Sequence, residues 1–417
     1  MDNRIIFHID ANSAFLSWSA VHALQHGAKV DLREIPSIVG GNQATRHGIV
    51  LAKSIPAKKY GIQTGEPVID AKRKCPKLIV IPPDYCLYMK CSGAMIEIFK
   101  GYSDQVQVFS IDECFIDMSN MKKLLGGDYI KIATEIKDRV RNELGFTVSI
   151  GISTNKLLAK MGSDLKKPDA VVTLFPEEIE EKMWCLPVRD LYMCGEATEK
   201  KLHGMGIYTI GNLAQAEPEF VKYKLKSLGE MLLSFANGIE NSQVKTNGAI
   251  PYVKGIGNSC TIHFDVEDHD TAHKVILSLV ETVGMRLRHG HFCCRLIQVS
   301  IKTNELISYS HQRKFEVPTD CTNAIYEKAC KLFDNVWKGE PIRRLGVRVS
   351  ELCGDDFVQL SFFDKNWEKQ RLIDKAVDEI RMKHGSLSVY RAGFLHSRLA
   401  PLQGGITEDF PIMTSIL

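Results

Sequence analysis

The order of strand-like and helix-like segments limits the fold of this chain more than any other feature. The first six segments are a strand at 3–10, an apolar helix ending near Gly27, strands at 106–110 and 114–118, an amphipathic helix at 129–145 and a strand at 146–153. This β-α-β-β-α-β order is the split βαβ, or ferredoxin-like, pattern. A large insertion, roughly residues 28–84, separates the first strand from its partners.

The same order returns later in the chain. The six segments are a strand at 259–264, a helix at 270–290, strands at 293–303 and 306–317, a helix at 323–337 and a strand at 343–352. Short helices, about 171–240, and a polar linker, 241–254, lie between the two patterns. We therefore expect an α+β protein with two ferredoxin-like domains, followed by a tail at 354–417 that contains one helix.

Composition narrows the class of protein. The chain of 417 residues is long enough for two to four domains with full-sized cores. It has no run of 18 or more apolar residues and no secretory pattern at its N-terminus, so we expect a cytoplasmic protein without a membrane segment. The twelve cysteines form no CxxC pair, which favours small buried hydrophobes over zinc ligands or disulfides. The net charge of +3 is too small to indicate nucleic acid, so that signal must come from local clusters.

Three acidic side chains stand where apolar residues dominate. Asp10 ends the first strand, and Asp112 and Glu113 lie at the bend between the second and third strands. These strands are neighbours in a ferredoxin-like sheet, so we expect the three carboxylates at one edge. They would repel one another there unless cations filled the site, and magnesium accepts such ligands. Two magnesium ions would serve a phosphoryl displacement. The simpler interpretation, that Asp112 and Glu113 are exposed turn residues, stays open at this point.

Four motifs, in this order and spacing, carry a family resemblance. They are FHIDANSAFLSW, SIDECFIDMS, VSIGISTNKLLAKMGSDLKKP and VRDLYMCGEATEKKLHGMGIYTIGNLA. Over residues 4–364 the chain resembles the Y-family translesion DNA polymerases, and most of all their bacterial DNA polymerase IV and ultraviolet-damage-repair branch. The resemblance implies a right-hand polymerase. Its parts are a ferredoxin-like palm (1–15 and 85–170), small fingers (16–84), a helical thumb with a helix–hairpin–helix (171–240) and a ferredoxin-like little finger (255–353).

The resemblance also implies roles around the acids. Asp10, Asp112 and Glu113 match the catalytic ligands of two Mg²⁺ ions, with the backbone carbonyl of Ala11 assisting. Phe15 matches the ring that leaves no room for a 2′-hydroxyl and so selects deoxynucleoside triphosphates. Without the motif, Phe15 would equally be a core aromatic residue on a buried helix.

Two lysines match the contacts of that family with the triphosphate. They are Lys58, where the family usually has arginine, and Lys167; most lysines are simply solvated surface charges. Lys58 loses the bidentate fork of arginine. Ser54 and Ile55 stand where the family usually has a tyrosine, and Ala14 replaces a bulky aromatic residue in the nucleotide pocket. These departures change the triphosphate contacts and the shape of the pocket that the resemblance implies.

Further matches concern DNA and a protein partner. Gly195 lies in the thumb hairpin, whose backbone N–H groups would bind phosphates, although an ordinary two-helix turn fits as well. The little-finger residues expected to follow the DNA backbone are Arg286, Arg288, Arg295, Lys302, Arg313 and Lys314, although a solvated face is the default for such charges. The peptide Gln359, Leu360, Ser361, Phe362 and Phe363 resembles the segment that bacterial polymerases insert into the sliding clamp.

Together these features predict a DNA-directed DNA polymerase, a nucleotidyltransferase of low processivity and fidelity that performs translesion synthesis. We expect it to act as a monomer on primer-template DNA. A catalytically inactive, polymerase-like accessory protein is one alternative, but it should lack one of the three acids. A nucleotidyl cyclase would share the acids and lysines, but not the helix–hairpin–helix, the second domain or the clamp peptide.

Overall fold

The computed structural model describes residues 4–42, 46, 48–122, 128–246, 253–356 and 367–402. These residues form two units. The first holds the residues up to Gly40 and those from Val50 to 246, and the second holds those of 41–49 and those from 253 onward. No helix within the described ranges is long and apolar enough to cross a membrane.

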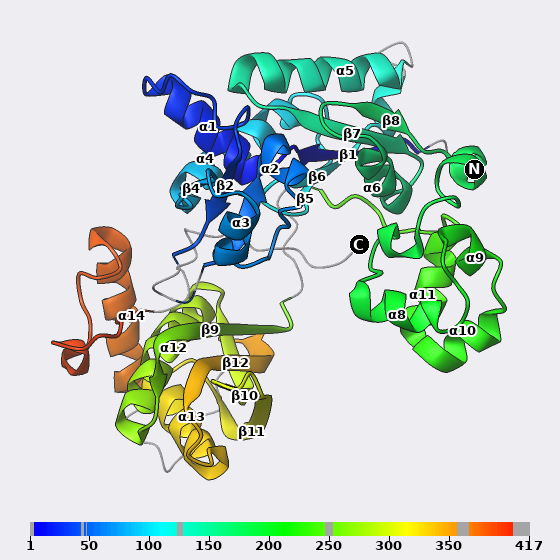
Figure 1. Cartoon of the computed structure of the whole chain (residues 1–417). Helices are drawn as coiled ribbons and strands as arrows, with labels where there is room; N and C mark the ends of the chain where they lie inside the picture. The colour runs from blue at the N-terminus through cyan, green and yellow to red at the C-terminus, as the bar shows by residue number, and fades with distance from the viewer. Residues whose placement is uncertain are drawn as a thin grey trace. The chain divides into compact units, whose positions relative to one another are not determined.

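The first unit is built on a five-stranded sheet with an apolar strand at its centre (Figure 1). The strands are β1 (Ile6–Ala11), β5 (Val106–Val108), β6 (Glu113–Asp117), β7 (Val148–Ser153) and β8 (Val171–Thr173), in the order β5-β6-β1-β7-β8. β1 pairs antiparallel with both β6 and β7, which gives the ferredoxin-like order. β8 pairs with β7, so this sheet continues to Thr173, beyond the expected palm boundary at 170.

Helices cover both faces of this sheet. They are α1 (Ala14–Gln25), α4 (Tyr85–Lys100), α5 (Tyr129–Arg139) with a π-helical turn (Val140–Leu144), and α6 (Lys156–Leu165). Phe7 and Ile9 of β1 share a buried core with side chains of α1, α4 and α5. The opposite face of the sheet lies against α6, where Ile6 packs with Ala159. Alternation along β1 therefore sends Asp10, like Ile6, toward the α6 side.

Two smaller regions complete the first unit. The insertion after α1 forms a sheet of order β3-β2-β4 with its own core; its elements are β2 (Ser37–Gly40), β3 (Val50–Lys53), α2 (Ile55–Lys59), α3 (Val68–Lys74) and β4 (Ile79–Ile81). After β8 come the short helices expected from the sequence, α7 (Ile179–Lys182), α8 (Glu196–His203), α9 (Ile210–Ala214), α10 (Pro218–Leu225) and α11 (Ser227–Ala236). They share an apolar core that also includes Leu157, Leu158 and Met161 of α6.

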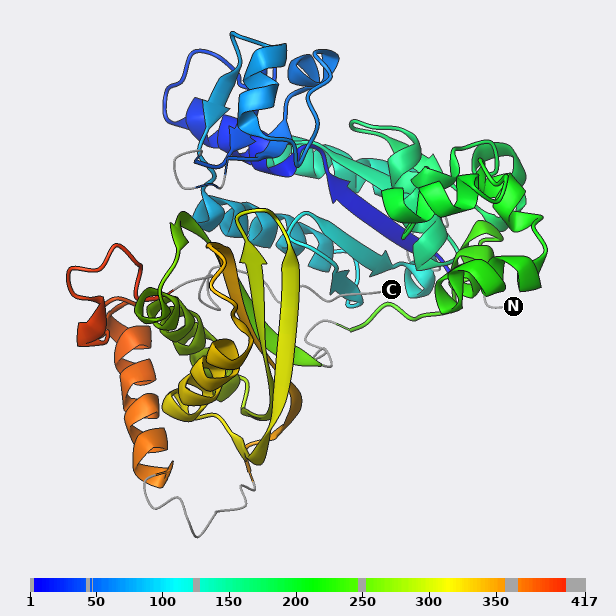
Figure 2. The ribbon, with the colours of Figure 1, turned by 60° about the horizontal axis from the view of Figure 1, so that its bottom comes forward.

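The second unit is a four-stranded antiparallel sheet with helices on one face. Its elements are β9 (Gly255–Val266), α12 (His269–His289), β10 (Phe292–Thr303), β11 (Ser308–Thr319), α13 (Thr322–Val336) and β12 (Ile342–Gly354). Figure 2 shows α12 and α13 together on that face. The strand order is β11-β10-β12-β9, so the first strand of this unit is an edge strand rather than a central one.

That order corrects the expectation of a second ferredoxin-like sheet. The α+β class and the separate C-terminal sheet are confirmed, but only the order of elements along the chain is repeated. The two first strands differ in side-chain pattern. β1 is almost wholly buried, as a central strand requires, whereas β9 alternates exposed and partly buried residues and pairs only with β12.

The tail contains the expected helix, α14 (Trp367–His384), which packs beside α12 (Figure 2). Buried ion pairs fix it there. Arg288 of α12 donates to Asp378 at 2.6 Å, and Arg381 of α14 donates to Glu281 at 2.8 Å. Removing only one partner of such a buried pair strongly destabilises the folded protein. The tail helix is therefore a third helix of the second unit.

Candidate active site

Backbone pairing brings the predicted acids together at one edge of the five-stranded sheet, where β1 ends and β6 begins. Asp10 lies directly opposite Glu113 in the register of β1 and β6. The N–H of Ala11 donates to the carbonyl of Asp112 at 2.9 Å. A tight turn precedes β6, since the N–H groups of Phe109 and Ser110 both donate to the carbonyl of Glu113. Two segments a hundred residues apart in the sequence are thus held together by main-chain hydrogen bonds.

A lysine pairs with each of the two facing carboxylates. Lys167 Nζ lies 2.9 Å from Asp10 Oδ1 and 2.8 Å from Asp164, and Lys160 Nζ, on α6, lies 2.8 Å from Glu113 Oε1. Burial, together with the neighbouring Glu113, raises the pKa of Asp10 to about 7 despite Lys167. Burial alone would lower the pKa of Lys167, but its two carboxylate partners raise it. A positive charge next to these carboxylates therefore stabilises their ionised form.

Asp112 has a different partner. Ser110 Oγ donates to Asp112 Oδ1 at 2.6 Å, so the Asp112 carboxylate is held within its own turn. Burial raises its pKa, and the charge of Glu113 adds to the effect. The simpler interpretation of Asp112 and Glu113 as exposed turn residues does not fit, because both are partly buried.

The α6 side of β6 is covered rather than open. Phe115 lies on the same face of β6 as Glu113, but it is fully buried and its ring lies 4.7 Å from that of His8. His8 is buried too, and its Nδ1 lies 2.7 Å from Ser163 Oγ. Burial and the nearby lysines hold the pKa of His8 well below its usual value, so it is neutral. Only the Glu113 end of this face reaches the site.

A cavity of about 370 Å³ extends from Asp10 toward the small sheet of the insertion. It combines Asp10 and Lys167 with three cations that line its other side, Arg33, Lys53 and Lys58. Lys58 is exposed on α2. Burial and the charge of Lys58 lower the pKa of Lys53. Arg33 and Lys53 were missed in the sequence; neither belongs to a recognised motif, and only the fold brings them to Asp10.

Ser54 has a structural role at this cavity. Its hydroxyl accepts from the N–H of Ala57 at 3.0 Å and donates to the carbonyl of Ile35 at 2.7 Å, so it caps α2 and joins that helix to the preceding loop. Ile55, in contrast, is largely exposed. The departures at these two positions leave α2 well formed and remove one aromatic hydroxyl from the cavity.

Asn12 is a second residue that sequence reasoning missed. Its Oδ1 accepts from the N–H of Asp169 at 2.8 Å and from Thr147 Oγ1 at 3.0 Å. Its Nδ2 donates to Ser149 at 2.9 Å. The side chain thus ties the end of β1 to the segment that carries Lys167. The signal was available, because Asn12 stands inside the FHIDANSAFLSW motif.

Phe15, the residue that the resemblance assigns to sugar selection, lies on α1 and follows the strand of Asp10. It is partly buried and stacks on Tyr88 of α4, with ring centroids 4.4 Å apart and planes at 6°. Tyr88 is fully buried, and its hydroxyl lies 2.9 Å from Ser19 Oγ. This stacking restrains the ring of Phe15 on the face that contacts Tyr88. Ala14 is buried beside it in the apolar core of this unit.

The donor groups fit a hard divalent cation. Three carboxylates and the carbonyl of Ala11 are all oxygen donors, which suits magnesium. Asp10 and Glu113 face each other, whereas the carboxylate of Asp112 is bonded to Ser110. The raised pKa values of Asp10 and Asp112 point the same way, since a cation would relieve the cost of burying these charges.

The thumb hairpin is a weaker phosphate site than the sequence suggests. Gly195 begins α8 with φ of −81°, a conformation open to any residue. Its carbonyl accepts from the N–H groups of Thr198 and Glu199, both at 2.9 Å. Two acids, Glu196 and Glu199, occupy the first turn and oppose a bound anion. Each acid is paired with a cation, Glu196 with Lys200 at 2.8 Å and Glu199 with Arg189 at 3.4 Å, which offsets part of their charge.

The cations of the second unit lie in several different settings. Lys302 lies on the face of the sheet opposite the helices, where it lines a hollow of about 810 Å³ with Arg344 and Arg348. The two arginines were missed, although RRLGVRVSEL alternates basic or small residues with apolar ones. Arg295 is exposed at the bulge of β10, and Lys314 pairs with Glu351 at 3.0 Å.

The other three predicted DNA contacts lie elsewhere. Arg288 is buried and bonded to Asp378 and Asp374, which corrects its assignment as a phosphate contact. Arg313 is opposite Ile297, a core residue, and so shares the face covered by helices. Arg286 lies on α12 and donates to Asn258 at 3.1 Å. The clamp-like peptide at 359–363 is outside the described residues.

Comparisons with known proteins give the class of protein for this fold and its acid-bearing edge, which is that of the Y-family DNA polymerases. A solved structure named as a Y-family DNA polymerase chimera of Dbh and Dpo4 superposes with a TM-score of 0.69, covering 84% of this chain and 99% of its own at 22% identity. The impB/mucB/samB family matches residues 9–164, and its C-terminal domain matches residues 253–362.

The curated relatives agree with this class. DNA polymerase IV of Clostridium acetobutylicum is 44% identical, over 94% of this chain and 98% of its own. That of Acetivibrio thermocellus is 42% identical, over 95% and 98%. DNA polymerase IV 1 of Bacillus subtilis is 33% identical, over 98% and 97%. The chain belongs to the impB/mucB/samB family of Y-family DNA polymerases, in its DNA polymerase IV branch. Membership implies the use of a divalent metal ion.

Proposed function

We propose that this translesion DNA polymerase uses Asp10, Asp112 and Glu113 to hold two Mg²⁺ ions as it extends a primer along a template. One observation carries the proposal. The register of β1 and β6, with the bond from Ala11 to Asp112, gathers acids from two distant segments at one sheet edge. Two bound ions would activate the primer hydroxyl and stabilise the charge on the departing pyrophosphate.

The chain's own cations complete the nucleotide site. Lys167 bridges Asp10 and the cavity, and Lys58 stands across from it on α2. Both are suited to the triphosphate as point charges. Lys53 and Arg33, which is paired with Asp31, also line the cavity. Asn12 acts as a positioning residue for the Lys167 segment through its bond to Asp169. A bound triphosphate would thereby be oriented with its α-phosphate toward the acids.

Phe15 supplies the choice of sugar in this proposal. The Phe15 ring rests on Tyr88 and so cannot retreat from a 2′-hydroxyl. A deoxyribose would fit against the ring, and a ribose would clash. By the family resemblance, Ala14 stands where an aromatic residue is usual, and its small side chain would suit a polymerase that tolerates damaged bases.

DNA would contact the chain at two further places. In the second unit, Lys302, Arg344 and Arg348 form a basic face of the sheet on the side away from α12 and α13, and Arg295 is a further exposed cation. The thumb hairpin at Gly195 would add backbone N–H groups. Few charges converge there, so low processivity is expected.

The remaining assignments rest on the resemblance and the boundaries of the elements. We assign the palm to residues 1–15 and 85–173, the fingers to 16–84, the thumb to 174–240, the linker to 241–254 and the little finger to 255–353. The peptide 359–363 would engage a sliding clamp. We further propose that the protein is a monomer, acts in the cytoplasm and copies DNA with low fidelity.

Primer extension on an undamaged and a lesion-bearing template tests this function. With Mg²⁺ and deoxynucleoside triphosphates, the chain should extend both primers, and a chelator should stop both reactions. No extension on either template would favour the inactive accessory protein. Formation of a cyclic nucleotide from a triphosphate without template would favour the cyclase.

A further inference from the structure

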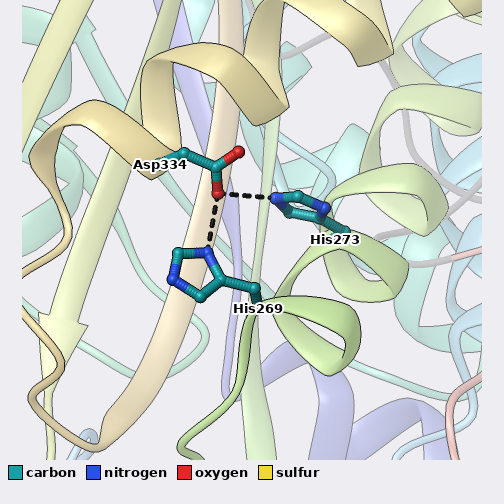
Figure 3. Close-up of side chains that lie close together, drawn as sticks. All are labelled: His269, His273 and Asp334. Carbon is teal, nitrogen blue, oxygen red and sulfur yellow. Dashed lines mark hydrogen bonds and ion pairs between the residues drawn. The ribbon is translucent and has the colours of Figure 1, made fainter.

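A cluster of two histidines and an aspartate lies in the second unit, apart from the acids of the first. His269 Nδ1 and His273 Nε2, both on α12, each lie 2.8 Å from the same oxygen of Asp334, on α13. Figure 3 shows the three side chains converging between the two helices. Among the described residues, this is a group of three whose ligand atoms all lie within 4.8 Å of one another.

The local sequence explains this convergence. His269 and His273 are four residues apart, so both side chains project from the same face of α12. Asp334 stands near the end of α13, which packs against α12. Aromatic rings restrain both imidazoles: His269 lies 4.7 Å from Trp337, and His273 lies 5.9 Å from Phe333. The rotamers that aim the nitrogens at Asp334 are therefore supported by packing.

From this geometry we propose that His269, His273 and Asp334 bind a divalent transition-metal ion of the zinc class. Two imidazole nitrogens and one carboxylate oxygen form the three-ligand set that zinc accepts, with a fourth position left for water. Imidazole suits zinc, copper or nickel and not magnesium, so this site differs in chemistry from the acids of the first unit. His269 and Asp334 are 57% and 41% exposed, which leaves that fourth position open to solvent.

The expected consequence is mechanical. The ion would replace the shared hydrogen bonds and join the first turn of α12 to the last turns of α13. Both helices cover the same face of the β11-β10-β12-β9 sheet, so the tie would raise the melting temperature of the second unit.

The chain contains a matched control. His22 and His26 on and after α1 are also four residues apart, with ring centroids 4.1 Å apart. His26 Nδ1, however, bonds to the carbonyl of His22 at 2.8 Å instead of to a carboxylate. Replacing this pair removes the same number of imidazoles without touching Asp334.

Zinc titration of the full-length, metal-free protein tests the proposal. Calorimetry is run with a reductant and excess Mg²⁺, which occupies sites made of carboxylates alone. The wild type and the variants keep all twelve cysteines, so thiol binding is common to all of them. His269→Gln/His273→Gln should lose one equivalent of Zn²⁺, Asp334→Asn should weaken that equivalent, and His22→Gln/His26→Gln should keep it.

Thermal unfolding supplies the second readout. Zn²⁺ should raise the melting temperature of the wild type and of His22→Gln/His26→Gln, and leave that of His269→Gln/His273→Gln unchanged. Equal zinc stoichiometry and affinity in the wild type and in His269→Gln/His273→Gln would overturn the proposal. So would an equal loss of zinc in the control pair.

Discussion

Asp10 and Glu113 face each other across the pairing of β1 and β6, and each is paired with a different lysine. Lys167 approaches Asp10 from the loop after α6, and Lys160 approaches Glu113 from α6 itself. Facing acids in a buried position repel, and the lysines offset part of that repulsion. The same arrangement makes the pair responsive to any further cation that enters the site.

The first prediction concerns protons. With a pKa of about 7, Asp10 is about half protonated at pH 7, and a divalent ion must displace that proton. Mg²⁺ binding at pH 7 should therefore release about half a proton, and its affinity should rise between pH 6 and pH 8. Calorimetry in buffers of different ionisation enthalpy measures the release. An affinity that falls over this range would count against the assignment.

The sign of the linked stability follows from the same shift. The pKa of Asp10 lies above its ordinary 3.8, so the folded chain holds a proton that the unfolded chain releases. Without divalent ions, this group makes folding less favourable as pH rises from about 4 to about 7. Asp10→Asn, which cannot ionise, should gain melting temperature relative to the wild type over that interval.

A second prediction separates two neighbouring lysines. Lys58 and Lys59 are both exposed on α2, but only Lys58 lines the cavity that contains Asp10. Lys58→Ala should raise the KM for deoxynucleoside triphosphates about tenfold, as expected for loss of one charge-assisted contact. Lys59→Ala should leave it unchanged, and Lys58→Arg should lower it. Equal effects of the two alanine variants in steady-state extension assays would refute the assignment.

A third prediction concerns the sugar. Phe15→Ala removes the ring that rests on Tyr88, so discrimination against ribonucleoside triphosphates should fall at least about tenfold. Tyr88→Phe is the control, because it keeps the ring and removes only the hydroxyl bonded to Ser19. Single-nucleotide incorporation with each sugar gives the ratio. Unchanged discrimination in Phe15→Ala would rule out this residue as the gate.

A fourth prediction sorts the arginines of the second unit. Arg344→Ala/Arg348→Ala should weaken DNA binding and reduce the slope of log affinity against log salt by about 2. Arg288→Met should instead destabilise the fold by about 3–5 kcal/mol, because it leaves Asp378 and Asp374 buried without their partner. Fluorescence anisotropy and denaturant unfolding distinguish the two. A lower salt slope in folded Arg288→Met would contradict the structure.

The sequence predicted the parts of this protein whose signals are local. The apolar run ending at Asp10 and the acids at the bend before β6 indicated which strands would meet, and the structure pairs Asp10 with Glu113. The family, the α+β class and the polymerase activity are confirmed by the comparisons. Gly145, with φ of 78°, ends its helix as a left-handed cap should.

What the sequence did not predict depends on long-range packing. Arginine is usually exposed, so the sequence favours a surface position for Arg288. It is buried because α14 packs against α12. Lys160 lies in a quoted motif, but its partner Glu113 is 47 residues away. The order of the second sheet is likewise invisible in the order of elements along the chain. The edge strand β9 and the central strand β1 differ in how completely their side chains are buried.

The most direct test of the account is primer extension by Asp112→Asn/Glu113→Gln in Mg²⁺. Extension should fall at least about thousandfold, since metal-assisted charge stabilisation is worth several kcal/mol. Glu177→Gln/Glu180→Gln removes the same charge from two exposed acids and should extend like the wild type. Circular dichroism and melting should show both variants folded. Wild-type extension by folded Asp112→Asn/Glu113→Gln would contradict the claim that these acids carry the reaction.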